Sequence, residues 1–175
     1  WVLFAPSPQG GITLKDGTLV MPSQGRNEQG TPFSNIMYSK DHGRSWTVSN
    51  PAVIGSSECQ AVQLDDGSLM LNMRTERGIA RFRSVFTTGD LGQTWAPHTT
   101  NQIGIIEPGC NGSLLRFDYQ DDGESRHVLL FANPQSQQSR VHHTIQVSFD
   151  EGRTWPEKYR LLLDVGRGAG YPSLT

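Results

Sequence analysis

Apolar and polar residues alternate along three well-separated segments, FSNIMYS (33–39), FRSVFTT (82–88) and HTIQVSF (143–149). Alternation with a period of two puts one set of side chains on each face of a strand, so each segment is predicted to be a half-buried β-strand. Helical spacing of apolar residues is hard to find anywhere in the chain. The 19 glycines and 10 prolines suit short strands joined by turns. The sequence therefore predicts an all-β fold.

Each of these strands runs into the same pattern: Ser or Thr, any residue, Asp, any residue, Gly, any residue, Ser or Thr, Trp. It occurs at 39–46, 88–95 and 148–155, and such recurrence indicates an internal repeat. The Asp side chain can accept hydrogen bonds from turn amides, Gly supplies a backbone conformation that other residues resist, and Trp is expected to pack between sheets. The three aspartates are therefore interpreted as structural: Asp41, Asp90 and Asp150.

A second repeated feature precedes each box. Leu19, Leu69 and Leu129 lie at nearly the same distance before the tryptophan of their boxes. The first two follow the motifs LKDGT and LDDGS, in which Asp-Gly between apolar runs is a strong hairpin signal. In the third repeat we expect this turn to be stretched, into FDYQDDGESRHV (117–128).

Each repeat thus contains an inner strand, a hairpin turn, two more strands, the Asp-box turn and a fourth strand. A four-stranded unit of roughly 50 residues is the size of a β-propeller blade. The blades are expected close to residues 8–50, 58–100 and 109–160, and GYPSLT (170–175) looks like the start of a fourth inner strand. Three blades cannot close a ring, and an open ring would leave unpaired edges. Residues 1–175 are therefore expected to be part of one larger propeller domain.

Composition excludes few functions but narrows the partners. The 15 Lys and Arg residues nearly balance the 17 Asp and Glu residues, which gives no reason to expect nucleic-acid or anionic-membrane binding. No apolar run approaches the roughly 18 residues of a membrane helix. No signal peptide is visible, and the chain begins with Trp rather than Met. Cys59 and Cys110 are interpreted as two buried thiols, although a disulfide between them is not excluded by the sequence.

The ends of the inner strands form the mouth of a propeller, so polar residues at these ends are candidates for chemistry. Glu58 begins the second inner strand and Tyr171 the fourth, both beside small residues. Arg74 and Arg140 lie in the connections between second and third strands. Two arginines beside a tyrosine and a glutamate would suit a substrate that carries a carboxylate.

Other polar residues are interpreted without a function. Arg77, Arg81 and Arg83 are expected to be surface charges. Glu107 precedes the third inner strand and is an alternative lining residue that we do not favour. His142 and His143 are adjacent at the start of a predicted strand. Adjacent strand positions point to opposite faces, so the two side chains are unsuited to binding one metal ion. No metal or other cofactor is expected.

The same segments carry a family resemblance. ECQAVQLDDGSLMLNMR (58–74), SRVHHTIQVSFDEGRTW (139–155) and GAGYPSLT (168–175), together with the three Asp-boxes, resemble the exo-α-sialidases (neuraminidases) of bacteria and animals. The resemblance spans essentially the whole chain and implies a six-bladed β-propeller, of which this chain would supply about half. It also implies hydrolysis of terminal α-linked sialic acid from glycans, with retention at the anomeric carbon.

By this resemblance, Tyr171 is the nucleophile, Glu58 takes its proton, and Arg74 and Arg140 hold the sugar carboxylate. A further arginine of the carboxylate site and an aspartate acid/base are expected upstream of the matched region, so the fragment alone is expected to be inactive. Pro172 is expected to restrict Tyr171 to extended backbone. Because sialylated glycans are mostly extracellular, a secreted, periplasmic or cell-surface location is expected.

Two alternatives remain open on the sequence. A non-catalytic Asp-box propeller could bind glycans or proteins, and a trans-sialidase could pass the sialyl group to another sugar. The distance between Tyr171 and Glu58 separates the first alternative from an enzyme, because catalysis requires the two side chains within hydrogen-bond reach.

Overall fold

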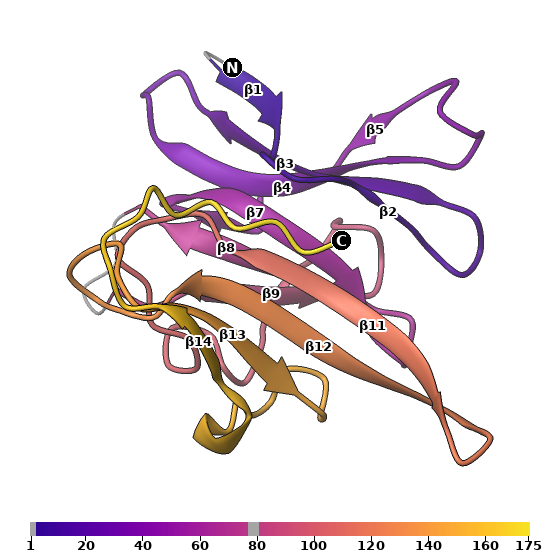
Figure 1. The fold of residues 1–175 in the computed structure, drawn as a ribbon. Helices are drawn as coiled ribbons and strands as arrows, with labels where there is room; N and C mark the ends of the chain where they lie inside the picture. The colour runs from indigo at the N-terminus through magenta and orange to yellow at the C-terminus, as the bar shows by residue number, and fades with distance from the viewer. Residues whose placement is uncertain (1–2, 77–80) are drawn as a thin grey trace.

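The chain forms three antiparallel sheets that follow one another in sequence (Figure 1). The structure is a computed structural model and describes residues 3–76 and 81–175. The first sheet comprises β1 (Leu3–Pro6), β2 (Ile12–Thr13), β3 (Leu19–Arg26), β4 (Pro32–Ser39), β5 (Thr47–Val48) and β6 (Val53–Ile54). The second comprises β7 (Ser56–Gln63), β8 (Leu69–Thr75), β9 (Ser84–Thr88) and β10 (Ala96–Pro97). The third comprises β11 (Ser113–Asp121), β12 (Glu124–Pro134), β13 (His143–Ser148) and β14 (Leu161–Asp164).

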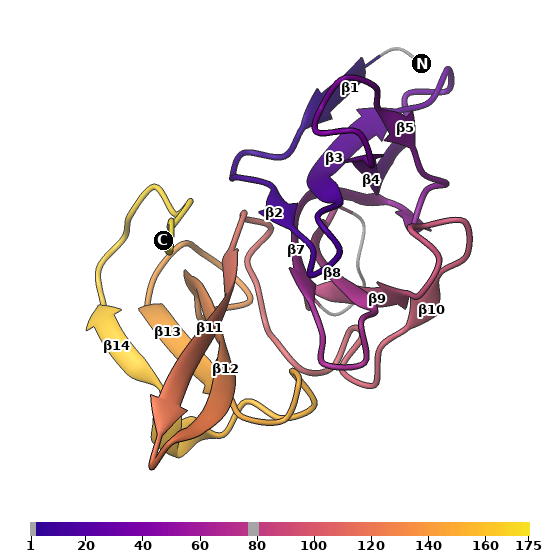
Figure 2. The same cartoon turned by 90° about the vertical axis from the view of Figure 1, so that its right-hand side faces the viewer.

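The sheets are arranged as blades. Figure 2 shows β2, β7 and β11 toward the middle of the molecule, with β5, β10 and β14 toward its outside. The described residues contain one short 3-10 helix, η1 (Glu157–Tyr159), and no α-helix. The prediction of an all-β chain is therefore confirmed.

The repeats superpose at the level of strand register. Each aligned leucine pairs with the first residue of the following Asp-box. The pairs are Leu19 with Ser39, Leu69 with Thr88, and Leu129 with Ser148. The leucine side chains are thus fixed relative to the turn that ends each third strand, as the sequence alignment predicted.

Three boundaries differ from the prediction. The first sheet begins at Leu3, because β1 and β2 pair in turn with β3 and together form its inner edge. The third hairpin is not a stretched turn: long strands run to Asp121 and from Glu124, and only Asp122 and Gly123 join them. Both of these residues have positive φ, as a two-residue hairpin requires. The fourth strand of the third sheet, β14, lies beyond the expected limit at residue 160.

GYPSLT (170–175), the expected start of a fourth inner strand, forms no strand in the structure. A strand needs a hydrogen-bonded neighbour, and no strand among the described residues pairs with this segment. The segment instead crosses the ends of the inner strands (Figure 1): Gln9 Nε2 donates to the carbonyl oxygen of Pro172, and the amide of Leu174 donates to Ser113 Oγ at 3.0 Å.

The Asp-boxes are structural, and the same hydrogen bonds recur in all three. In the first, Ser39 Oγ donates to Asp41 Oδ1 at 2.8 Å and accepts from the amide of Gly43 at 2.8 Å. Ser45 donates to Asp41 twice, from its amide at 2.8 Å and its hydroxyl at 2.6 Å. The residue between Asp and Gly has positive φ in every box, as does the glycine. The carboxylate therefore holds a turn that the backbone alone would disfavour.

Two apolar cores lie between successive sheets. Leu69, Leu71 and Met73 of β8 pack toward the first sheet, whereas Met70 packs toward the third. Burial on both faces explains why β8 reads as a nearly continuous apolar run.

Two of the three box tryptophans pack in or against these cores. Trp95 packs against the core between the first and second sheets, and Trp155 is buried in the core between the second and third. Each contacts the preceding sheet. Trp46 is 41% exposed and belongs to neither core, so the prediction that it packs between sheets is wrong in this structure.

The aspartates of the three Asp-boxes predict that the fold loses stability in acid. Hydrogen bonds from Ser45 and Ser39 lower the pKa of Asp41 to about 2, those from Thr94 and Thr88 lower that of Asp90 to about 2, and the pKa of Asp150 is also lowered. A carboxylate with a depressed folded pKa stabilises the fold above its unfolded pKa of about 3.9, and this contribution is lost as the pH falls toward about 2.

We therefore expect each Asp→Asn variant at these three positions to unfold at lower temperature than the wild type at pH 6. The difference should shrink between about pH 4 and about pH 2. Thermal unfolding of the complete protein measures it. Asp122→Asn is a matched control, because Asp122 has no side-chain hydrogen bond within the described residues and Asn-Gly suits the same turn. An equal destabilisation at all pH values would contradict the role given to the charge.

Candidate active site

Glu58 and Tyr171 lie in direct contact although they are far apart in the sequence. Glu58 is the third residue of β7 and is 9% exposed. Tyr171 comes from the C-terminal segment that crosses above β7, and its hydroxyl donates a hydrogen bond to Glu58 Oε1. The structure therefore brings together the two residues for which the sequence predicted catalytic roles, within the reach that proton transfer requires.

Arg74 joins this pair from β8. Its Nη1 donates to Glu58 Oε2 at 2.8 Å and to Tyr171 Oη at 3.3 Å. On its other side, Nε lies 2.9 Å from Oε1 of Glu76, in an ion pair without hydrogen-bond geometry. The three predicted residues form a closed triangle of tyrosine, carboxylate and guanidinium. Glu76 is a fourth member that the sequence analysis missed.

Arg140 is close to Tyr171 but does not join Arg74. Its Nη1 donates to the carbonyl oxygen of Ala169 at 2.6 Å, and its guanidinium carbon lies 5.4 Å from the centre of the Tyr171 ring. A cation over an aromatic face is attracted to it. Arg140 also lines an open pocket of about 380 Å³ together with Arg167.

The backbone of Tyr171 is left-handed, with φ of +63°, so the prediction of an extended tyrosine is wrong. Glycines precede it in the segment, at positions where a side chain would not fit. Gly170 also has positive φ, and a side-chain carbon there would lie 2.3 Å from Cys110 Sγ. At Gly168 such a carbon would lie 2.6 Å from Nε2 of His143. The glycines thus let the segment lie directly on the third sheet, which places the phenol over β7.

The electrostatics of the site favour a neutral phenol. Burial raises the pKa of Tyr171, and the Glu58 carboxylate raises it further, while Arg74 opposes both. Burial alone would lower the pKa of Arg74, but Glu58 and Glu76 outweigh it and raise that pKa above its usual value. At neutral pH Tyr171 is therefore protonated, and its hydroxyl donates the hydrogen bond to Glu58.

The prediction for Arg83 is wrong, and its partner is Glu107. Arg83 was predicted to be a surface charge but is fully buried, and it forms an ion pair with Glu107 at 2.9 Å. Glu107 is equally buried and so does not line an open pocket. Arg81 is exposed, as predicted, and Arg77 lies outside the described residues.

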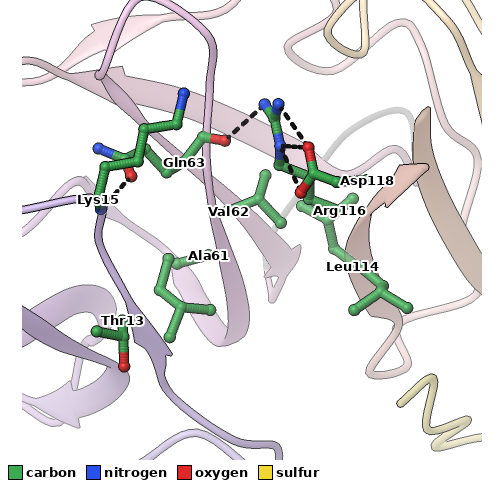
Figure 3. Close-up of a pocket in the computed structure, with 10 residues that line it drawn as sticks. Thr13, Lys15, Ala61, Val62, Gln63, Leu114, Arg116 and Asp118 are labelled. Atoms are coloured by element: carbon green, nitrogen blue, oxygen red, sulfur yellow. Dashed lines mark hydrogen bonds and ion pairs between the residues drawn. The ribbon is translucent and has the colours of Figure 1, made fainter. Parts of the chain in front are cut away.

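The cavity in Figure 3 lies apart from these residues. It has a volume of about 250 Å³ and is lined by parts of the inner strands, including Thr13, Ala61 and Leu114, and by the charged side chains of Lys15 and Arg116. It contains none of the four predicted site residues. We place the candidate chemistry at Glu58 and Tyr171, because a hydroxyl, a carboxylate and the Arg74 guanidinium meet there at the ends of the inner strands.

The cysteines are free and buried, as predicted, and burial raises the pKa of the Cys59 thiol to about 12. Among the described residues, one group has the side chains to hold a metal ion: Asp65, His127 and Glu151, with ligand atoms within 4.8 Å of one another. His127 Nε2 already contacts Glu151, and Arg116 lies 2.8 Å from Asp65. The group is satisfied as an ion network between the second and third sheets.

Comparison with known proteins decides the family. A family model described as a BNR repeat-like domain matches residues 2–155. The chain belongs to this family. As a BNR-repeat chain it is similar to a sialidase of Bacteroides fragilis strain YCH46, at 39% identity over 175 residues, which is 100% of this chain and 32% of that protein. A sialidase of Micromonospora viridifaciens is 34% identical over 151 residues, covering 85% of this chain and 22% of that protein.

The solved structures agree with this placement of the BNR-repeat chain. The Hadza microbial sialidase Hz136 superposes with a TM-score of 0.90 at 41% identity, over 97% of this chain and 32% of that one. The predicted fold class, a sialidase-like six-bladed β-propeller of which the chain forms about half, is confirmed. The chain spans about a third of the length of the Bacteroides fragilis sialidase and of the Hz136 sialidase. Its described residues include no helix long and apolar enough to cross a membrane.

Proposed function

We propose that the complete protein containing this chain is an exo-α-sialidase, which releases terminal α-linked sialic acid from glycoproteins, glycolipids or oligosaccharides. The observation that carries the proposal is the hydrogen bond from the Tyr171 hydroxyl to Glu58, with Arg74 bound to both. Similarity to sialidases along the whole chain supports it. A purely glycan-binding propeller would have no need of a tyrosine held against a buried carboxylate.

The chemistry of the substrate explains the choice of nucleophile. Sialic acid carries a carboxylate on its anomeric carbon, which would repel an ionised carboxylate nucleophile. Tyr171 can attack as a neutral hydroxyl while Glu58 takes its proton. The bond to the leaving sugar breaks as the tyrosyl–sugar bond forms, and water later cleaves that bond with overall retention. Sialidases with a tyrosine nucleophile are a recognised exception to two-carboxylate glycosidases.

Arg74 and Arg140 are the proposed partners of the substrate carboxylate, since each guanidinium can donate two parallel hydrogen bonds. Arg74 would exchange one of its contacts with Glu58 for the substrate. The acid that protonates the leaving group has no counterpart among the site residues of this chain. We expect it, with a further arginine, from another part of the complete protein.

Three measurements on the complete protein test this function. Release of 4-methylumbelliferone from its α-sialoside tests hydrolysis, and proton NMR of the first product tests retention through the α-anomer. Intact-mass analysis after incubation with a 2,3-difluorosialic acid, followed by peptide mapping, tests the covalent step. No release and no adduct would leave a glycan-binding propeller as the better account. Transfer of sialic acid to added lactose in preference to water would indicate a trans-sialidase.

Lysine substitutions test the carboxylate partners. Lysine keeps the charge but cannot donate two parallel hydrogen bonds, and losing one charge-assisted bond costs about 1.5–3 kcal/mol. Arg74→Lys and Arg140→Lys should each lower kcat/KM by about ten- to a hundredfold. Arg140→Lys should act mainly through KM, whereas Arg74→Lys should also lower kcat because Arg74 contacts Glu58 and Tyr171. Near-wild-type kcat/KM in both variants would show that other residues hold the carboxylate.

We further propose that the protein is secreted, periplasmic or bound to the cell surface, where sialylated glycans are found. Fractionation of the source cells with an antibody against this chain tests the location. Recovery only with cytosolic markers would count against it.

A further inference from the structure

A buried ion pair lies behind the candidate site. Arg83 and Glu107 are 0% and 1% exposed at their side chains, and Arg83 Nη1 lies 2.9 Å from Glu107 Oε2. Neither residue forms a hydrogen bond or ion pair with Tyr171 or Glu58 within the described part of the chain. A buried pair of this kind costs desolvation energy and is weak evidence of a contribution to stability. Its remaining hydrogen bonds therefore matter for what it does.

These hydrogen bonds fix two parts of the second sheet to the start of the third. Arg83 Nε donates to Asn72 Oδ1 on β8 at 2.7 Å, and Arg83 Nη1 donates to the carbonyl oxygen of Cys110 at 2.9 Å. The other carboxylate oxygen of Glu107 accepts from the amide of Thr75 at 2.7 Å. Each polar atom of the Glu107 carboxylate thus has a partner, which makes the arrangement rigid.

At each end, this network reaches a residue that adjoins the candidate site. Thr75 is the neighbour of Arg74 in β8, so the Glu107 carboxylate holds the backbone that carries the guanidinium. Cys110 lies against Gly170, the neighbour of Tyr171, so Arg83 holds the surface on which the tyrosine segment rests.

We propose that Arg83 and Glu107 are positioning residues for the sialidase reaction: the pair sets the spacing between Arg74 and Tyr171, so that both reach Glu58. This inference rests on the proposed function. Misplacing a reacting group by about 1 Å can cost about a hundredfold in rate, so a pair that holds two of the three groups should affect turnover without touching the substrate.

The test uses the double variant Arg83→Met/Glu107→Met in the complete protein. Replacing both charges by apolar side chains of similar size avoids an unpaired buried charge and often preserves stability. We expect kcat for the 4-methylumbelliferyl α-sialoside to fall by about ten- to a hundredfold, with a smaller change in KM, at temperatures well below the unfolding midpoint. A well-folded double variant with wild-type kcat would overturn the proposal.

The control is Arg126→Met/Glu124→Met, which removes an exposed ion pair on the β11–β12 hairpin, and it should leave kcat unchanged. If the buried double variant does not fold, Glu107→Gln is the second variant. Gln can accept from Thr75 or pair with Arg83 through its single oxygen, but not both, so kcat should fall less but measurably. Unchanged kcat in Glu107→Gln would also overturn the proposal.

A readout independent of turnover separates this inference from the proposed function. Crystal structures of the wild type and the double variant should show the Tyr171 hydroxyl and the Arg74 guanidinium displaced from Glu58 by about 1 Å or more. Wild-type protein without sialidase activity would refute the proposed function alone. Unchanged positions of Tyr171 and Arg74 in the double variant would refute the positioning role, whatever the activity of the wild type.

Discussion

Replacing Tyr171 by phenylalanine is expected to lower kcat of the complete protein by about a thousandfold or more, because the proposed covalent nucleophile is lost. The substitution removes only the hydroxyl, which donates to Glu58 and accepts from Arg74. The ring remains and can still lie under the Arg140 guanidinium. Because the carboxylate partners persist, KM should change much less than kcat.

Steady-state hydrolysis of the α-sialoside measures both constants, and adduct formation with the difluorosialic acid should disappear in the same variant. Tyr119→Phe is a matched control, since Tyr119 lies on the β11–β12 hairpin and stacks with Phe117. It should behave as the wild type. If Tyr171→Phe retains more than about a tenth of the wild-type kcat, the nucleophile is another group and the proposed mechanism is wrong.

The blade repeat could be predicted because its causes are local. The box residues bond to one another within a few positions, so the pattern fixes its own turn geometry wherever it occurs. The register of each Leu against its Ser or Thr follows from the hairpin length between them. The stretched third turn was mispredicted because a long polar stretch can be either a loop or two exposed strands, and only cross-strand pairing distinguishes them.

The burial of Arg83 depends on residues from another sheet, which a single strand pattern does not contain. One signal was present: in FRSVFTT, Arg83 shares a face with Val85, and Val85 lies in the core between the second and third sheets. A charge on a core face requires a partner, and the chain next returns to that core at Ile105, two residues before Glu107. Tyr171 offered no comparable signal, since its segment contacts residues that are far away in the sequence: Gly170 lies against Cys110, and the Tyr171 hydroxyl donates to Glu58.

Replacing Glu58 by glutamine is expected to lower kcat by about a hundred- to ten-thousandfold, the usual range for loss of a general base. Each carboxylate oxygen now accepts one hydrogen bond, from Tyr171 at Oε1 and from Arg74 at Oε2. Glutamine has one acceptor oxygen and one donor amide. Because Arg74 can only donate, the amide oxygen should face Arg74, and the NH₂ group should then face the tyrosine and donate to it. The phenol would keep a hydrogen-bond partner but lose the group that takes its proton.

The matched control for this effect is Glu76→Gln, which removes a carboxylate beside Arg74 without altering any contact of Tyr171. It should lower kcat/KM by less than tenfold, since an ion pair that is partly open to water contributes little. The two variants change the charge around Arg74 by the same amount, so a larger kcat loss in Glu58→Gln isolates the proton acceptor from the electrostatic effect on the arginine. Equal losses in the two variants would mean that Glu58 serves only to neutralise Arg74, and the base that activates Tyr171 would have to lie elsewhere in the complete protein.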